Sequence, residues 1–238
     1  HKEDIKISNL ENVYESIYQV KKKLEGLGKP LIGFAAAPWT LATYLIEGRL
    51  TKEHSTVREF AYRKPELMDK IIDILSKLIT SHLENQIKSG ADIIQLFDTH
   101  ANNMDKFLFH KYFLKEITRI CKTIKSKFPN TPIVLFSKSN YILEQEIFSY
   151  IDCISFNSHV NMKDFLKKIP QNICFQGNLD PMRLLVGGEQ LVIAAESILT
   201  DMKDRNFIFN LGHGVLKDTP VRNVNLLIET VRKFKGKV

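Results

Sequence analysis

The sequence predicts an α/β protein built on parallel strands, and three observations lead to this prediction. Short apolar runs alternate with stretches of helical periodicity along the chain. The apolar runs are hydrophobic without interruption, which is typical of parallel strands covered on both faces. Nearly every run is followed by polar residues, glycine or proline. These features indicate repeated strand–helix units with polar side chains gathered at the ends of the strands.

Six strands and the helices between them are expected from these patterns. The strands are expected at residues 30–36, 91–97, 132–136, 151–156, 172–176 and 206–211. The clearest helix begins at Pro65, a favourable first-turn residue, and its apolar stripe is Leu67, Ile71, Ile74, Leu75, Leu78 and Leu83. Further helices are expected at residues 10–26, 104–128, 141–149, 161–168, 188–203 and 219–234, and Asp180 with Pro181 is expected to begin a helix after the fifth strand. Because no long linker and no internal repeat interrupts this order, a single domain over residues 1–238 is expected.

Composition bounds the class of protein. The chain has 238 residues and 44% hydrophobic content, enough for one large core. Its 34 Lys and Arg exceed its 27 Asp and Glu, so the net charge of +7 attracts anions, either nucleic acid or a polycarboxylate. The basic residues are dispersed along the chain, which does not favour a nucleic-acid interface. No apolar run is long enough to span a membrane, so neither nucleic acid nor a membrane is expected as a partner.

The three cysteines favour a reducing compartment. Cys121, Cys153 and Cys174 are odd in number, lie far apart and lack CxxC spacing. This pattern argues against a disulfide framework.

The strand ends distinguish an open sheet from a closed barrel. An open sheet concentrates its ligand at one switch point, whereas a (β/α)₈ barrel gathers the ends of all its strands around one mouth. Polar or special residues follow nearly every expected strand, at 37–40, 98–100, 137–138, 157–159, 176–180 and 210–214. The barrel is therefore favoured. Only six strand–helix units are present, so two are expected to be missing, and only the N-terminus has room for them.

The last expected strand ends in an unusual way. The run "NFIFNLGHGV" at 206–215 places His213 between Gly212 and Gly214. Glycine on both sides lets the backbone turn sharply and come close to another group. From these residues alone, His213 is either a solvated turn histidine or a site residue.

Four stretches together resemble the uroporphyrinogen decarboxylase family. They are "GFAAAPWTLATYLIEG" (33–48), "GADIIQLFDTHANNM" (90–104), "FQGNLDPMRLL" (175–185) and "NLGHGVLKDTPVRNV" (210–224). From about residue 30 to residue 234, the chain looks like the C-terminal two-thirds of such an enzyme.

The resemblance implies a distorted (β/α)₈ barrel that acts as a homodimer in haem and tetrapyrrole biosynthesis. Members of the family convert the acetate side chains of uroporphyrinogen III to methyl groups and release coproporphyrinogen III, with no metal or organic cofactor. Cytoplasm and plastid stroma both suit this pathway and the cysteine pattern.

The resemblance also carries site residues onto this chain. Tyr44 matches the family's active-site tyrosine, and His213 matches its "NLGHG" histidine. Thr99 stands where the family usually has serine, which keeps the hydroxyl. Tyr44 and His213 are thus the expected catalytic residues, and both are expected to bind substrate together with Thr99 and Asn178. The alternatives are purely structural roles: a core tyrosine for Tyr44, a helix cap for Thr99 and a capped loop histidine for His213.

Three neighbouring residues have open roles. His100 is expected to be a hydrogen-bonded support rather than a catalyst. Lys138 follows a strand and could meet a carboxylate, although a solvated lysine is the simpler interpretation. For Asp98, a structural pairing and a ligand role are equally compatible with the sequence.

The chain also departs from the family. No arginine-rich "RQAGRY" motif occurs in it, and no aspartate matches the one that grips the pyrrole NH groups in the family. We therefore expect these residues alone to be inactive or weakly active. The alternatives are a catalytically incomplete fragment or a tetrapyrrole-binding paralogue. A zinc-dependent methyltransferase of the same barrel superfamily is disfavoured, because no histidine has a cysteine two positions later.

Overall fold

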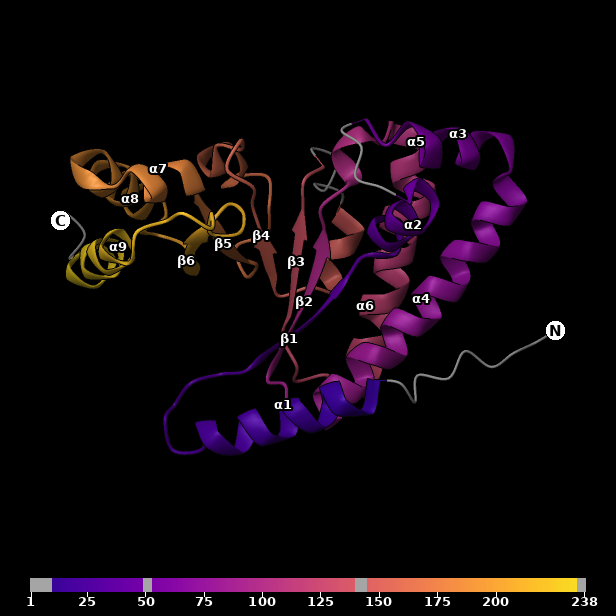
Figure 1. Ribbon diagram of the computed structural model, residues 1–238, viewed down its shortest axis with the longest axis horizontal. Coiled ribbons are helices and arrows are strands. Elements are labelled where there is room, and N and C mark those ends of the chain that lie inside the picture. Colours follow the sequence, from indigo (N-terminus) through magenta and orange to yellow (C-terminus); the bar gives the residue numbers. More distant parts are fainter. Residues whose placement is uncertain (1–9, 49–52, 140–144, 235–238) are drawn as a thin grey trace. The chain divides into compact units, whose positions relative to one another are not determined.

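The computed structural model describes residues 10–48, 53–139 and 145–234, and it divides after Ile151 into two compact units. Each unit contains three parallel strands with helices between or after them (Figure 1). All six predicted strands are confirmed, within about three residues at each end. The alternation of strands and helices confirms the α/β class, while the prediction of one domain stays a prediction.

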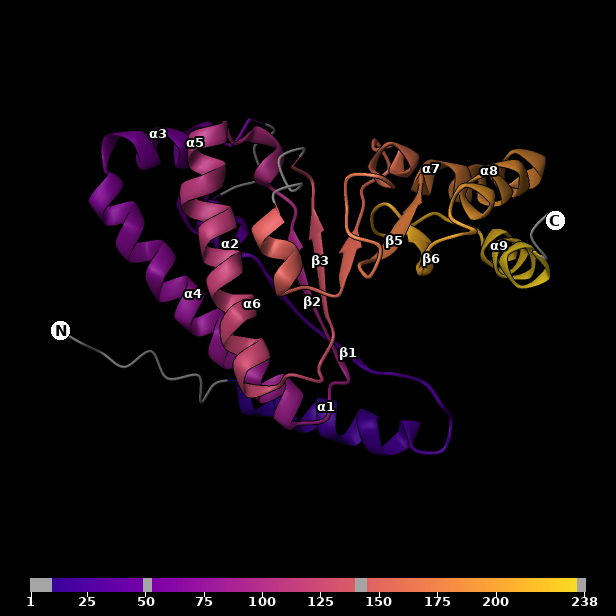
Figure 2. The same ribbon diagram turned by 180° about the vertical axis from the view of Figure 1, so that it is seen from behind.

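The first unit is built on β1 (Ile32–Ala36), β2 (Ile93–Asp98) and β3 (Ile133–Ser137), which pair in that order. The register places Asp98 directly beside Ser137 at the ends of β2 and β3. The helical segments of this unit are α1 (Glu11–Leu24), α2 (Pro38–Glu47), α3 (Ser55–Arg63), α4 (Pro65–Lys88), η2 (Ala101–Asn103), α5 (Lys106–Leu108), η3 (Phe109–Leu114), α6 (Lys115–Lys127) and η4 (Gln145–Ser149). Helices α4 and α6 run side by side along this sheet (Figures 1 and 2).

The second unit is built on β4 (Cys153–Ser155), β5 (Cys174–Leu179) and β6 (Phe207–Leu211), also in sequence order. Its helical segments are η5 (Met162–Phe165), α7 (Pro181–Val186), α8 (Gly188–Asp201) and α9 (Val221–Lys233). A compact apolar core joins β5 to these helices through Leu179, Leu184, Leu191, Ala195 and Leu227. As the sequence predicts, Asp180 and Pro181 begin α7, and the Asp180 carboxylate accepts a hydrogen bond from the backbone N–H of Met182.

Helix α4 begins at Pro65 as predicted, but its buried face differs from the predicted stripe. The buried apolar residues are Met68, Ile72, Leu75, Ile79 and Leu83, whereas Leu67 and Ile74 are 45% and 44% exposed. The helix carries apolar residues on more than one face. A shift of one position rotates a side chain by about 100°, so the sequence could not choose between neighbouring stripes.

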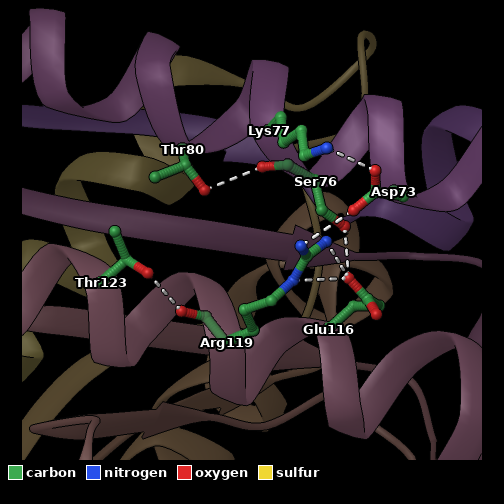
Figure 3. Close-up of polar contacts among 7 residues, drawn as sticks. All are labelled: Asp73, Ser76, Lys77, Thr80, Glu116, Arg119 and Thr123. Atoms are coloured by element: carbon green, nitrogen blue, oxygen red, sulfur yellow. Dashed lines mark hydrogen bonds and ion pairs between the residues drawn. The ribbon is translucent and has the colours of Figure 1, made fainter.

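A polar layer lies between α4 and α6 (Figure 3). Glu116 is buried, and its Oε2 accepts hydrogen bonds from Ser76 Oγ at 2.8 Å and from Arg119 Nε at 3.1 Å. Arg119 Nη1 also donates to Asp73 Oδ1 at 2.9 Å, and Lys77 pairs with the same carboxylate at 2.7 Å. The buried Glu116 carboxylate is thus paired and hydrogen-bonded, which removes most of the cost of its burial.

Two predicted helices are corrected. The expected helix 161–168 is only the short 3₁₀ segment η5, because Pro170 disfavours a helical conformation at the residue before it and leaves little length for an α-helix. The expected helix 141–149 lies partly outside the described residues, and the part that is described is η4, also a 3₁₀ helix.

The prediction that every strand is buried on both faces is wrong for the first and last strands. Phe34 and Ile32 on β1 are 62% and 45% exposed, and Ile208 on β6 is 45% exposed. One face of each of these strands is not covered by the described residues, whereas β3 and β4 are buried throughout. Within the described ranges, no helix is long and apolar enough to cross a membrane.

Candidate active site

The ends of β1, β2 and β3 bring several polar side chains of the first unit together. Helix α2 begins directly after β1, with Pro38 in its first turn. Its residues Thr40 and Tyr44 therefore follow the end of that strand. Thr99 and His100 follow β2, and Lys138 follows β3. The first unit therefore contains two of the four predicted site residues, Tyr44 and Thr99.

Asp98 is the centre of this arrangement. It is fully buried, and its two carboxyl oxygens accept hydrogen bonds from Thr40 Oγ1 and Ser137 Oγ, each at 3.0 Å. The backbone N–H of His100 donates a further hydrogen bond to it. Burial raises the pKa of Asp98 to about 7, although these hydrogen bonds oppose the rise. Of the two roles compatible with the sequence, the structure shows the pairing: Asp98 ties α2, β2 and β3 together.

Thr40 links the buried carboxyl to Thr99. Its hydroxyl donates to Asp98 and accepts a hydrogen bond from the backbone N–H of Thr99 at 3.2 Å. Thr99 is half-buried and is not the cap of the helical turn that follows, because the cap position is occupied by His100. The alternative role of Thr99 as a helix cap is therefore wrong.

Three aromatic rings pack in a row beside this carboxyl. The ring of His100 lies edge-on to that of Tyr44, with centroids 5.0 Å apart, and edge-on to that of His54, with centroids 4.3 Å apart. His54 Nδ1 in turn lies 3.2 Å from the Asn103 side-chain amide. Tyr44 is 52% exposed, so the alternative of a core tyrosine is wrong.

His100 supports its neighbours through its ring rather than through its side-chain nitrogens. Its Nε2 is buried and has no hydrogen-bond partner among the described residues. Burial, together with the positive charges of His54 and Lys138, lowers the pKa of His100 to about 4. The imidazole is therefore neutral near pH 7, and the expectation of a hydrogen-bonded side chain is corrected to a packed one.

Lys138 is half-buried rather than fully solvated. Burial lowers its pKa, and the negative charge of Asp98 opposes that shift. The backbone N–H of Lys138 donates to the carbonyl of Asp98 at 3.1 Å, which fixes the start of the residue beside the buried carboxyl. Its ammonium group has no carboxylate partner within ion-pair distance among the described residues.

The other two predicted site residues belong to the second unit. Asn178 lies within β5 rather than after it, and it is buried. Its Nδ2 donates to the carbonyls of Asn157 and Val160, at 2.9 and 2.6 Å. Asn178 therefore holds the loop after β4 and lines one side of a cavity of about 500 Å³ beside α7 and α8.

His213 lies on the exposed loop after β6. The backbone N–H of Gly214 donates to its Nδ1 at 2.7 Å, so the neutral imidazole carries its proton on Nε2. Gly212 is buried against the backbone of Ser158, where a Cβ atom would collide with main-chain atoms. The close approach that the two glycines predict is confirmed at Gly212, while Gly214 has open space around it.

Sequence reasoning missed Thr40 and His54. Neither residue belongs to a catalytic pattern that stands out in one sequence. Thr40 lies two residues after Pro38, which begins a helix at a strand end, so its position in the first turn was a signal. His54 lies far from His100 along the chain, and only packing shows that the two rings touch.

Comparison with known proteins identifies the family. The model of the family described as uroporphyrinogen decarboxylase matches residues 1–234. The chain belongs to this family. Among curated relatives, the uroporphyrinogen decarboxylase of Rickettsia africae is 38% identical over 230 residues, which are 96% of this chain and 66% of the relative. The uroporphyrinogen decarboxylase of Campylobacter hominis is 37% identical over 229 residues, or 95% and 66% of the two chains.

These relatives confirm the family resemblance drawn from the four sequence stretches. The chain spans 66% of the length of the curated relatives. Their identity over nearly the whole chain confirms that it corresponds to about two-thirds of a uroporphyrinogen decarboxylase sequence.

Solved structures share the fold. A methyltransferase from Methanosarcina mazei superposes with a TM-score of 0.78 at 21% identity, over 93% of this chain and 64% of that protein. A B12-independent methionine synthase from Shewanella sp. W3-18-1 gives a TM-score of 0.55 at 16% identity, over 92% and 66% of the two chains. At these identities the likeness shows the fold alone, and it agrees with the barrel class expected from the strand ends.

Proposed function

We propose that the strand-end residues of this chain bind uroporphyrinogen III and serve the decarboxylation of its four acetate side chains, which yields coproporphyrinogen III. The observation that carries the proposal is membership of the family, whose curated relatives are named uroporphyrinogen decarboxylase at 37–38% identity. The excess of basic residues, 34 against 27 acidic ones, suits a polycarboxylate substrate.

The reaction needs an electron sink and three proton transfers. Protonation of a pyrrole ring carbon creates a cation that accepts the electron pair of the breaking C–C bond as CO₂ leaves. A second proton then reaches the exocyclic carbon, and the ring carbon loses the proton it gained. The net change for each arm is one carboxylate and one proton converted to a methyl group and CO₂. The protein contributes by stabilising the cation and by delivering protons at fixed positions.

Tyr44 and His213 are the proposed catalytic residues. Tyr44 presents an exposed phenol at the end of α2, held edge-on by the His100 ring. His213 presents an exposed imidazole whose Nδ1 accepts from Gly214, and an imidazole on this loop can donate a hydrogen bond to a substrate carboxylate. Both groups can donate a hydrogen bond to the substrate or pass a proton to it.

Thr99, Asn178 and Lys138 are proposed to bind substrate. The Thr99 hydroxyl stands beside a backbone fixed by Thr40 and Asp98. Asn178 shapes the loop after β4 through its amide. A half-buried lysine that lacks a carboxylate partner among the described residues suits a carboxylate of the substrate, because its ammonium group is already partly desolvated.

We further propose that these 238 residues alone release CO₂ slowly or not at all, and that the active form is a homodimer. Asp98 is fully buried and hydrogen-bonded, so it does not reach a bound pyrrole and cannot replace the aspartate that the family uses there. Substrate binding is thus proposed for this chain, whereas turnover by it alone is not.

Tetrapyrrole binding tests the proposal with a built-in probe. Trp39 is the only tryptophan of the chain and lies in α2, one turn before Tyr44. Uroporphyrin III bound at the strand ends is expected to quench its fluorescence with a dissociation constant in the micromolar range, on the order of −8 kcal/mol. Coproporphyrinogen formation from uroporphyrinogen III is measured on the same sample.

Matched variants give the controls. Tyr44→Phe and His213→Gln are expected to weaken binding, whereas Tyr18→Phe on α1 and His110→Gln on η3 leave it unchanged. Absence of quenching by the tetrapyrrole, or equal binding by all four variants, would contradict the proposed function.

A further inference from the structure

Two of the three cysteines stand side by side in the second unit. Cys153 is the first residue of β4, Cys174 is the first residue of β5, and the strand register pairs them directly. Neighbouring strands lie about 4.8 Å apart. That spacing falls within the range of roughly 4.4–6.8 Å between the Cα atoms of disulfide-bonded cysteines. Paired residues on adjacent strands point to the same face, so the two thiols face each other.

The two thiols are chemically different. Cys153 is buried, whereas Cys174 is half-buried and open to solvent on one side. The Sγ of each cysteine donates to the backbone carbonyl of the next residue, Cys153 to Ile154 at 3.8 Å and Cys174 to Phe175 at 3.5 Å. The neighbouring Cys153 thiol lowers the pKa of Cys174, whereas the neighbouring Cys174 and burial raise the pKa of Cys153. Cys174 is therefore the thiol of the pair that ionises first.

A buried cation is anchored at the start of β5. The residue Arg205 is only 8% exposed, and its guanidinium donates to the carbonyl of Ile173 at 2.9 Å and lies 4.1 Å from the ring centroid of Phe175. These contacts hold it against the residues on either side of Cys174. Its other hydrogen bonds are to carbonyl and amide oxygens, and no carboxylate lies within ion-pair distance among the described residues. A buried cation paired only with neutral groups favours an anion nearby, and its charge adds to the lowering of the Cys174 pKa.

We propose that Cys153 and Cys174 form an oxidisable thiol pair that hydroperoxides convert to a disulfide. In the first step, the Cys174 thiolate attacks one oxygen of hydrogen peroxide, the O–O bond breaks, and a proton is taken up to give Cys174 sulfenic acid and water. In the second step, the Cys153 sulfur displaces the hydroxyl group from Cys174, which leaves as water with the Cys153 proton. Two thiols are oxidised by two electrons, and one peroxide is reduced to two waters.

The pair is distinct from the proposed tetrapyrrole site. Cys153 and Cys174 begin their strands, whereas the loop of His213 follows the end of β6, and neighbouring strands are parallel. The cross-link would clamp β4 to β5 at the ends opposite the candidate active site of this unit. The remaining cysteine, Cys121, is buried in α6 of the first unit and serves as an internal control.

Intact-mass measurement on the reduced protein tests the proposal. After one equivalent of hydrogen peroxide, the mass is expected to fall by about 2 Da, and a thiol reductant restores it. Alkylation in denaturant then labels one thiol instead of three, and peptide mapping shows Cys121 labelled and Cys153 linked to Cys174.

Single variants assign the two roles. In Cys153→Ser, a first equivalent of peroxide is expected to oxidise Cys174 to the sulfenic acid and a second to the sulfinic acid, with a total gain of about 32 Da and no cross-link. In Cys174→Ser, oxidation of the remaining pair member is expected to slow by about tenfold or more, because the Cys153 thiol is buried. Cys121→Ser is expected to behave like the unmodified chain.

Three outcomes would overturn the proposal. They are three alkylatable thiols after peroxide treatment, sulfinic acid at Cys174 without a cross-link in the unmodified chain, and a disulfide that includes Cys121. Each outcome is measured on the cysteines themselves, so the test does not depend on whether the chain binds a tetrapyrrole.

Discussion

The strand ends of the two units are built in different ways. In the first unit, a fully buried carboxyl, Asp98, holds Thr40, Ser137 and the backbone of His100, and aromatic rings pack beside it. In the second unit, the strand ends are shaped by the main chain: Gly212 closes on Ser158, and Asn178 binds loop carbonyls. The side chain proposed to act on the substrate in that unit, His213, lies on the exposed loop that follows.

This difference separates two kinds of sensitivity. Where side chains are hydrogen-bonded to a buried titratable group, stability is expected to depend on pH, because the charge of that group changes with pH. Where a close main-chain contact positions an exposed side chain, replacing the glycine at that contact is expected to lower stability, whereas replacing the exposed side chain is not. The following variants test that contrast, in order of decreasing effect.

Gly212→Ala is expected to be the most damaging change. The added Cβ would collide with the main chain of Ser158, which cannot move aside as a flexible side chain can. We expect a loss of about 3 kcal/mol in the free energy of unfolding, typical of a strongly overpacked position. Urea denaturation measures it. Gly214→Ala is the matched control and is expected to change stability by less than about 0.5 kcal/mol, because its Cβ meets open space. Equal effects of the two substitutions would contradict the main-chain contact.

Asp98→Asn is expected to change how stability depends on pH. Because burial raises the folded-state pKa of Asp98 to about 7, the folded protein holds a proton that the unfolded chain releases from about pH 4 upward. The resulting stabilisation is present at low pH and is lost as the pH rises through 7. Between pH 5 and pH 8, the free energy of unfolding of Asp98→Asn should therefore fall by roughly 2–3 kcal/mol less than that of the unmodified protein.

Asp92→Asn is the opposite-sign control for Asp98. A hydrogen bond from the Leu31 backbone and the ammonium of Lys21 lower the pKa of Asp92, so its stabilisation is present at high pH and is lost on acidification. Urea denaturation at pH 3, pH 5 and pH 8 compares the two variants, because Asp92→Asn is expected to alter the pH dependence of stability below about pH 5 and Asp98→Asn mainly between pH 5 and pH 8. A pH dependence that shifts in the same direction in both would show that Asp98 is not the buried acid inferred here.

His100→Phe is expected to act in the same pH window with the opposite sign. The folded-state pKa of His100 is lowered to about 4, so the unfolded chain gains a proton between about pH 6.5 and 4 that the folded protein does not. The contribution of His100 to stability is therefore lost as the pH falls through this range. Phenylalanine keeps the ring contacts with Tyr44 and His54, so the variant should resist acid better than the unmodified protein. Thermal melting at pH 5 and pH 7 checks this, and an unchanged acid response would argue against a neutral, buried His100.

His213→Ala is expected to have the smallest effect on folding. The side chain is exposed on its loop, so the free energy of unfolding should change by less than about 0.5 kcal/mol. Affinity for uroporphyrin III should nevertheless fall by about tenfold, or 1.4 kcal/mol, if the imidazole donates to a carboxylate of the tetrapyrrole. Trp39 quenching measures the affinity. A large loss of stability with unchanged affinity would reverse the roles assigned to the two regions.

Local patterns in the sequence were enough to predict the strands, most helices and the family. The apolar runs, the helix start at Pro65 and the cap at Asp180 depend on neighbours within a few residues, and all three are confirmed. The motifs around Tyr44 and His213 were visible for the same reason, because each is a continuous stretch of the chain.

Only the tertiary structure decided what surrounds those residues. The ring contact of His54 with His100 and the hydrogen bonds of Asp98 with Thr40 and Ser137 join positions that are 39 to 58 residues apart, so no local period encodes them. The face of α4 that packs inward and the exposed face of β1 likewise depend on which elements cover them. Residue type fixes which contacts a side chain can make, but burial and partners, which set its pKa and its role, arise only when distant segments pack together.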